Sequence, residues 1–180
     1  MAHKIVLPVL DKHRKDIYLW RFHRRAARDN AGHQFSFIFY ASPSAARKIY
    51  RSIEADSLLN QLKQSGIIVR YIFDDTGTVK KPGIEDTSDP IWSRQIQKSW
   101  PYFIMGASQT WLDLIVQQSL SKAVENTPSS LTELTNFYQR LHQSINASWQ
   151  TEGRHAFLHH LNAIFGYEPV IIYEKRLMRF

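Results

Sequence analysis

Two histidines near the C-terminal end of the chain, His155 and His159, have a spacing that indicates chemistry most directly. On a helix, residues four positions apart share one face, and two neutral imidazoles there can bind one divalent metal. Glu152 is a third candidate ligand only if that helix begins before Gly153. The zinc-protease pattern requires a glutamate directly after the first histidine, where this sequence has Ala156. The alternative is an exposed, weakly basic helix face, which two ligands without a third favour.

Two carboxylates, Asp74 and Asp75, directly follow the apolar run of residues 67–73. Carboxylates after a central strand are common functional groups in α/β sheets, as magnesium ligands or general bases. They open an irregular acidic stretch, residues 74–90, whose length is typical of lids, binding loops and linkers. The competing interpretation is that turn formation and helix capping account for these acids.

Tryptophans are concentrated in residues 88–118, where apolar positions recur every three or four residues. This spacing predicts a long amphipathic helix with a kink or a break at Pro101 and Gly106. The stripe consists of Trp92, Ile96, Trp100, Phe103, Ile104, Ala107, Trp111, Leu114 and Ile115. Its rings are expected in the hydrophobic core, in the wall of a pocket for a small organic ligand, or at a subunit interface. The candidate pocket residues are Trp92, Trp100, Tyr102, Trp111, Arg94, Gln109, Asp74 and Asp75.

Basic residues form a further set at the two ends of the chain. Its members are Arg21, Arg24, Arg25, Arg28, Lys175 and Arg176. If the first and last strands lie side by side, these residues form one positive patch interleaved with rings, a mixture that binds single-stranded nucleic acid. Strand alternation argues against this, because it places Trp20 and Arg21 on opposite faces. The sequence also lacks an RNA-recognition aromatic motif, a GXXG loop and zinc-finger spacing.

The first half of the chain predicts strands and short helices. Residues 17–25 and 34–41 alternate in period two and are expected to pair as an antiparallel hairpin. Ser42 and Pro43 predict the start of a helix. Residues 67–73 contain too few polar side chains for an exposed sheet face, so they are expected to form a central strand.

The boundaries of the next helix are also indicated. Asp56-Ser57 is expected to cap a short helix that runs to Gln64, and Gly66 is expected to terminate it. In the second half, residues 131–149 repeat apolar side chains at helical spacing, after a Ser130-x-x-Glu133 capping box. Gly153 is expected to separate this helix from a shorter one.

The end of the chain completes the predicted sheet. The shorter helix is expected over residues 154–165, and Gly166 is expected to end it. Residues 169–180 are expected to form a final strand that returns to the sheet of the first half.

Composition restricts the class of protein. The chain has 180 residues, a net charge of +7 and no cysteine. The length is that of one domain, and the charge favours anionic partners. The lack of cysteine excludes disulfides and thiolate chemistry, and fits a reducing compartment, so a cytoplasmic location is expected. No stretch approaches the ~20 apolar residues of a membrane span.

These observations predict a single α+β domain over residues 1–180. A mixed or antiparallel sheet, in the order ββαβ–ααα–β, would carry helices mainly on one face. The sequence contains no P-loop, no G-x-G-x-x-G and no G-x-S-x-G. It does not identify a reaction or a cofactor. The first functional hypothesis is binding of a small organic ligand in the aromatic pocket. The second is a non-enzymatic protein whose basic strands contact nucleic acid or an acidic partner, and the third is a histidine-based metal-binding protein. A homo-oligomer is compatible with each.

Overall fold

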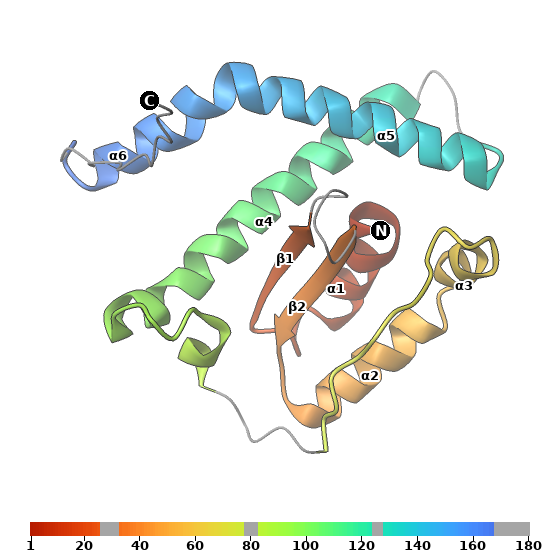
Figure 1. The fold of residues 1–180 in the computed structure, drawn as a ribbon, viewed down its shortest axis with the longest axis horizontal. Coiled ribbons are helices and arrows are strands. Elements are labelled where there is room, and N and C mark those ends of the chain that lie inside the picture. Colours follow the sequence, from red (N-terminus) through yellow and green to blue (C-terminus); the bar gives the residue numbers. More distant parts are fainter. Residues whose placement is uncertain (26–32, 78–82, 124–127, 168–180) are drawn as a thin grey trace, which may run out of the picture. The chain divides into compact units, whose positions relative to one another are not determined.

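The computed structural model describes residues 1–25, 33–77, 83–123 and 128–167. They form a mixture of helices and one two-stranded antiparallel sheet, which confirms the predicted mixture of helix and sheet (Figure 1). Contacts between residues divide the chain into two compact units, Met1–Leu131 and Thr132–Phe180. The boundary lies near Leu131 and not in the long acidic stretch. Whether the units fold as the single predicted domain stays a prediction.

The sheet of the first unit is the predicted hairpin. Strand β1 (Leu19–Arg25) pairs antiparallel with β2 (Gln34–Tyr40), and Phe22 lies opposite Phe37. Both predicted strands and their pairing are therefore confirmed. Because side chains alternate along each strand and opposite residues share a face, this register fixes which residues lie together.

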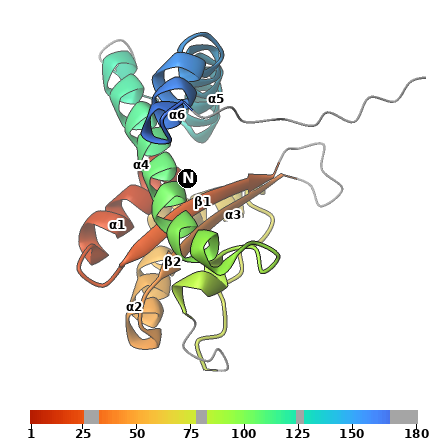
Figure 2. The same ribbon diagram turned by 90° about the vertical axis from the view of Figure 1, so that its left-hand side faces the viewer.

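Helix α4 (Arg94–Ala123) lies along the outer edge of β1. The backbone N–H of Phe22 donates to Ser108 Oγ at 3.2 Å, so this N–H points away from β2 and towards the helix. In both views of the molecule α4 runs beside β1 (Figures 1 and 2). The helix therefore covers an edge whose unpaired backbone groups would otherwise be open to pairing.

The N-terminus is helical, which is not among the features expected above. A π-helical turn (Ala2–Val6) leads into α1 (Leu7–His13). The buried residues are Ala2, Ile5, Val6, Val9, Leu10 and His13. Their spacing of three and four is the helical signal, and Pro8 lies in the first turn of α1.

Helices α2 (Pro43–Glu54) and α3 (Ser57–Gln64) begin as predicted. Ser42 Oγ accepts from the N–H of Ala45 at 3.3 Å, and Asp56 Oδ1 accepts from the N–H of Leu59 at 2.8 Å. Each side chain satisfies a backbone donor that a helix leaves without an internal partner.

These helices supply the core of the first unit. Gly66 follows α3 with a φ of +75°, which confirms its terminating role. Ile49 of α2 is completely buried, and Leu59 and Leu62 of α3 form a buried cluster with Ile5.

The predicted central strand at residues 67–73 is wrong. This segment is described, and it belongs to no helix or sheet. Val69 and Ile72 are 87% and 75% exposed. The apolar composition predicted burial on both sides, but the segment runs along the surface in front of α2 (Figure 1).

Helix α4 is continuous from Arg94 to Ala123. Of the predicted kink or break at Pro101 and Gly106, the break is therefore absent, and the kink stays a prediction. The predicted apolar stripe also has the wrong phase, because Ile96 and Phe103 are 54% and 52% exposed. The buried residues are Pro101, Ser108, Leu112, Ile115 and Ser119. Two serines lie in the buried stripe, and their polarity hid its phase from a hydrophobic pattern.

The second unit is one nearly continuous helical segment. Helix α5 (Leu131–Ser148) starts where predicted and continues into a π-helix (Trp149–His159) and α6 (His160–Ile164). The predicted separation at Gly153 is therefore wrong. A Cβ at Gly153 would lie 2.6 Å from the Trp149 ring, so the absence of a side chain serves this close approach.

The end of the described chain agrees with the sequence. Gly166 follows α6 with a φ of +73°, which confirms the predicted stop. The predicted final strand, residues 169–180, lies outside the described residues. None of the described helices has both the length and the apolarity needed to cross a bilayer.

Candidate functional site

The clearest arrangement of polar groups and rings is on the hairpin, where two arginines of β1 lie over tryptophans of α4. The guanidinium carbon of Arg21 is 4.7 Å from the centroid of the Trp100 ring. That of Arg24 is 5.0 Å from the centroid of Trp111. Both distances fall within the range of cation–π attraction. Arg21 and Arg24 point to opposite faces of the strand, and both reach α4 because the helix lies along the strand edge.

One face of the hairpin is made of rings and one arginine. The residues are Trp20, Phe22, Arg24, Phe35, Phe37 and Phe39, here called the aromatic face. Its rings are in contact across the strands and along them: the Phe22 and Phe35 centroids are 5.4 Å apart between β1 and β2, and those of Phe37 and Phe39 are 5.2 Å apart along β2. Each of these rings is half-buried, whereas Arg24 is exposed. The face therefore combines accessible π-surface with a positive charge.

The aromatic face continues onto two helices. The Phe22 ring contacts Trp111 of α4 at a centroid distance of 5.2 Å, and Phe39 contacts Tyr50 of α2 at 5.7 Å. Tyr50 in turn stacks on Phe73 at 4.5 Å. Helices at both ends thus hold the rings in place, which reduces the entropy that a ligand would have to remove on binding.

Arg21 and Arg24 differ in how far their guanidinium groups are available to bind a ligand. Arg21 Nη1 donates to the carbonyl of Thr87 at 2.6 Å, so this guanidinium is already bonded. Partial burial lowers the pKa of both guanidinium groups from the ordinary arginine value. The residue Arg24 is exposed as a whole, although its guanidinium lies over the Trp111 ring. Both groups stay charged at neutral pH, because an arginine pKa starts far above it.

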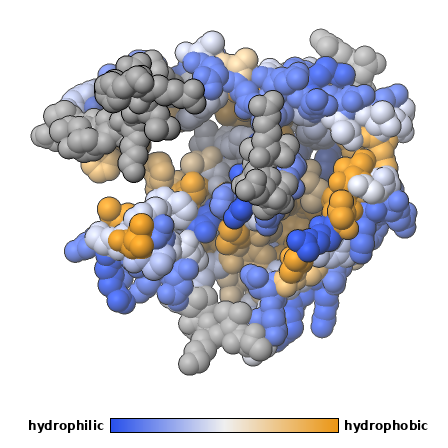
Figure 3. All heavy atoms as spheres, viewed as in Figure 1, coloured by the Kyte–Doolittle hydropathy of each residue, from blue (hydrophilic) through white to orange (hydrophobic). Residues whose placement is uncertain are grey.

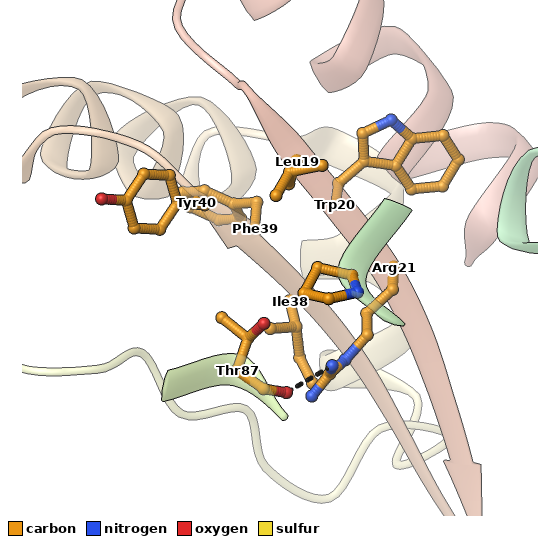
Figure 4. A pocket seen from close by; sticks show the side chains of 8 residues that line it. Leu19, Trp20, Arg21, Ile38, Phe39, Tyr40 and Thr87 are labelled. Atoms are coloured by element: carbon orange, nitrogen blue, oxygen red, sulfur yellow. Dashed lines mark hydrogen bonds between the residues drawn. The ribbon is translucent and has the colours of Figure 1, made fainter. Parts of the chain in front are cut away.

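A small hollow lies beside Arg21, between the hairpin, the turn at Thr87 and Pro101 of α4 (Figure 4). It is lined by Leu19, Trp20, Arg21, Ile38, Phe39, Tyr40, Thr87 and Pro101. The room inside is about 20 Å³. That is enough for about one water molecule and far less than the several hundred Å³ of a typical organic-ligand pocket.

The structure distributes the rings of the predicted pocket among different neighbours. Trp92 and Trp100 contact each other at 5.3 Å. Tyr102 Oη lies 3.3 Å from the hydroxyl of Tyr18, and Trp111 packs on the hairpin. None of these four residues lines the hollow described above. Ligand binding by this set stays a prediction.

The polar members of the predicted pocket also have separate partners. Arg94 forms an ion pair with Glu85 at 3.2 Å, and Gln109 Nε2 donates to a carboxylate on its own helix at 2.7 Å. Asp75 Oδ1 accepts from the N–H of Gly77 at 2.8 Å, a turn-forming bond of the kind expected from the structural interpretation. Asp74 is exposed, and its backbone bonds to Tyr50.

Half of the predicted basic patch lies outside the described residues, namely Arg28, Lys175 and Arg176. Of the rest, Arg24 and Arg25 are exposed at the end of β1, beside the exposed His23. The basic patch as a whole therefore stays a prediction. Its proposed continuation onto the last strand is not tested.

His155 and His159 do lie side by side. Their rings are 5.1 Å apart and nearly parallel, and the His160 ring is 5.4 Å from that of His155. All three are exposed. Across the part of the chain that the structure describes, no group of three or more potential ligands is placed to hold a metal ion. Binding through His155 and His159 stays a prediction.

Two features of the site were missed from the sequence. Arg24 has the same strand parity as Trp20 and Phe22, so alternation alone places it with the rings, although the neighbouring Arg21 points the other way. Ser108, which bonds to the edge of β1, had no recognisable signal in the sequence, because its role depends on the position of a helix far along the chain.

Comparison with known proteins adds no assignment. The chain matches no protein-family model, and neither the curated proteins nor the solved structures contain a significant match.

Proposed function

We propose that the protein binds single-stranded nucleic acid on the aromatic face, as a non-enzymatic interaction protein. The observation that carries the proposal is the exposed residue Arg24, whose guanidinium lies over Trp111 on the same face as a layer of half-buried rings. Unpaired bases stack on such rings for about 1–3 kcal/mol each, and arginines contact the phosphates between them. The net charge of +7 adds a field that attracts polyanions.

The geometry favours this function over the pocket hypothesis. A pocket for an organic molecule would gather Trp111, Tyr102 and the acidic residues around a common cavity. Their contacts instead lie in separate places, and the hollow beside Arg21 has room for about one water molecule. A single strand needs no enclosed cavity, because it binds along an open surface.

A fluorescence-anisotropy titration tests the proposal, with a labelled oligothymidylate of about a dozen nucleotides, in the range of site sizes for such surfaces. Arg24→Ala should weaken binding about tenfold, since a bond to a charged group is worth roughly 1.5–3 kcal/mol. The affinity of the wild-type protein should fall with salt, with a logarithmic slope of about −0.7 for each phosphate contacted.

Arg94→Ala is the matched control. It removes one positive charge as well, but Arg94 pairs with Glu85 and is not on the aromatic face. Equal losses in the two variants would mean that only net charge matters. No binding by the wild-type protein at low salt, or binding that is independent of salt, would reject the proposal. Thermal unfolding of both variants ensures that a loss of affinity does not reflect a loss of fold.

A further inference from the structure

Residues 67–73 have the composition of a strand without the hydrogen bonds of one. The N–H of Ile68 donates to the carbonyl of Leu62 at 3.0 Å. Within the described chain, the backbone groups of Val69 to Phe73 form no hydrogen bond with one another or with any other residue. β-branched and aromatic residues favour paired strands, and unpaired extended backbone is a template for another strand.

From Arg70 to Asp74 the side chains divide into an inner and an outer set. Tyr71 and Phe73 are half-buried, with Tyr71 under the Lys63 ammonium at 5.0 Å and Phe73 stacked on Tyr50 at 4.5 Å. These contacts fix the segment on its own protomer. The alternate residues, Arg70, Ile72 and Asp74, are exposed.

The charges of the outer set are complementary to those of a second, identical segment that runs in the opposite direction. Along the chain the outer set reads positive, apolar, negative, with Ile72 at the centre. In an antiparallel pair of identical segments related by a twofold axis at Ile72, each residue faces the one at the same distance on the other side of the centre. Arg70 of one copy then lies opposite Asp74 of the other, twice.

We propose that this segment is a self-association surface, at which two copies of the chain pair as antiparallel strands about Ile72. Tyr71 of each copy lies opposite Phe73 of the other, and these two residues exchange N–H···O=C bonds in both directions. The backbone groups required are those that have no hydrogen-bond partner among the described residues. Asp74 directs its backbone towards Tyr50, which leaves the alternate positions, 71 and 73, directed outwards.

The surface around the segment supports the same partner. Ile67, Val69 and Ile72 are exposed, and apolar atoms are gathered on this side of the molecule, along the segment in front of α2 (Figure 3). A second copy buries these side chains together with the unpaired strand. An unrelated extended peptide would satisfy the backbone but would not supply the reversed order of charges.

The association is expected to be weak. One short strand pair buries less than the ~1,200–2,000 Å² of a standard stable interface, and both copies carry a net charge of +7. We therefore expect a concentration-dependent equilibrium between monomer and dimer, rather than an obligate dimer.

Sedimentation velocity of the full-length chain tests the proposal, over concentrations from tens of micromolar to about one millimolar. The 21.1 kDa monomer should shift towards twice that mass as concentration rises. Arg70→Asp and Asp74→Arg should each abolish the shift, because like charges then face each other across the pair.

Mixing provides the decisive comparison. An equimolar mixture of the Arg70→Asp and Asp74→Arg proteins should form a mixed dimer. The first protein is negative at both positions 70 and 74 and the second is positive at both, so opposite charges face each other across the pair. The double variant should recover the wild-type behaviour. Circular dichroism of every variant checks that the fold is retained.

Three results would overturn the proposal. The first is a wild-type protein that stays monomeric over the whole range. The second is a mixture of single variants that associates no more than either alone. The third is hydrogen exchange at Tyr71 and Phe73 that is already slow in the dilute protein, since this would show that the strand has a partner within its own chain.

Discussion

Arg21 and Arg24 show how a long side chain can leave the face to which its strand assigns it. Both lie over tryptophans of α4, although alternation directs them to opposite faces of β1. Arg24 is nevertheless exposed as a whole residue. Arg21 is half-buried and bonded to Thr87. At this scale, side-chain chemistry is predictable, but the partner depends on where a distant helix packs.

Tyr138 provides a prediction at the level of a single group. Burial raises its pKa to about 12, compared with about 10 for an unperturbed tyrosine. Between these two values the unfolded chain has lost the proton and the folded chain still holds it. The free energy of unfolding should therefore fall as pH rises from about 10 to about 12. Below that window both states hold the proton, so this group adds no pH dependence.

The measurement is the urea midpoint as a function of pH for the wild-type protein and Tyr138→Phe. The variant should lose part of the alkaline decline, while its slope below pH 10 should match the wild type. Other tyrosines are unchanged, so the difference between the two proteins isolates Tyr138. Parallel curves throughout the alkaline range would show that the group is not desolvated in the folded state.

At the scale of elements, α4 accommodates a proline in its interior with the help of a loop. Pro101 has no N–H, so the carbonyl of Gln97, four residues earlier, lacks its helical donor. Ser88 supplies one instead, because its Oγ donates to the Gln97 carbonyl at 2.7 Å. This bond explains how the helix continues through Pro101 without a break, and it attaches the end of the acidic stretch to α4.

A double-mutant cycle tests this substitution of donors. Ser88→Ala should lower the free energy of unfolding by about 1 kcal/mol, because it leaves the Gln97 carbonyl without a protein donor. In a Pro101→Ala background the same change should cost much less, since a backbone N–H is restored at position 101. Urea unfolding of the four proteins gives the coupling energy. Additive effects would mean that the Ser88 bond does not compensate for the proline.

The segment at residues 67–73 and helix α4 were misread for related reasons. In the first, apolar composition predicted burial, although no neighbouring strand pairs with it in the described chain. In the second, buried serines shifted the apparent phase of the stripe. Ser108 and Ser119 are each bonded, to Phe22 and His3 as well as to their own helix. A hydrophobic pattern cannot identify polar groups that become buried because tertiary partners satisfy them.

At the scale of the whole molecule, the two units differ in the core that each contains. Four of the five largest fully buried side chains, Ile5, Ile49, Leu59 and Leu112, belong to the first unit, and the second contributes Leu141. A helical segment with so few buried residues gains little from its own packing. The first unit, by contrast, contains a sheet, several helices and a connected core.

A truncated chain of residues 1–131 is therefore expected to unfold in one cooperative transition. A chain of residues 132–180 should unfold without a sharp transition, because a helix of this length is marginal in water without packing. Circular dichroism during thermal unfolding compares the two. If the first fragment has no cooperative transition, the chain folds as the single domain that the sequence predicts.

Local structure was determined largely by the sequence itself. The hairpin strands, the caps at Ser42 and Asp56 and the stop at Gly66 were all predictable, because alternation, capping and positive φ depend on residues close together in the chain. The aromatic face was predictable in the same way, once the register of the hairpin was known.

Tertiary structure alone decided which of these local features meet. It placed α4 along the edge of β1, brought two arginines over two tryptophans and left residues 67–73 at the surface, with no strand partner among the described residues. These outcomes depend on contacts between residues far apart in the chain. Such contacts form only where packing and hydrogen bonding together offset the entropy of closing the loops between them, and no local pattern encodes that balance.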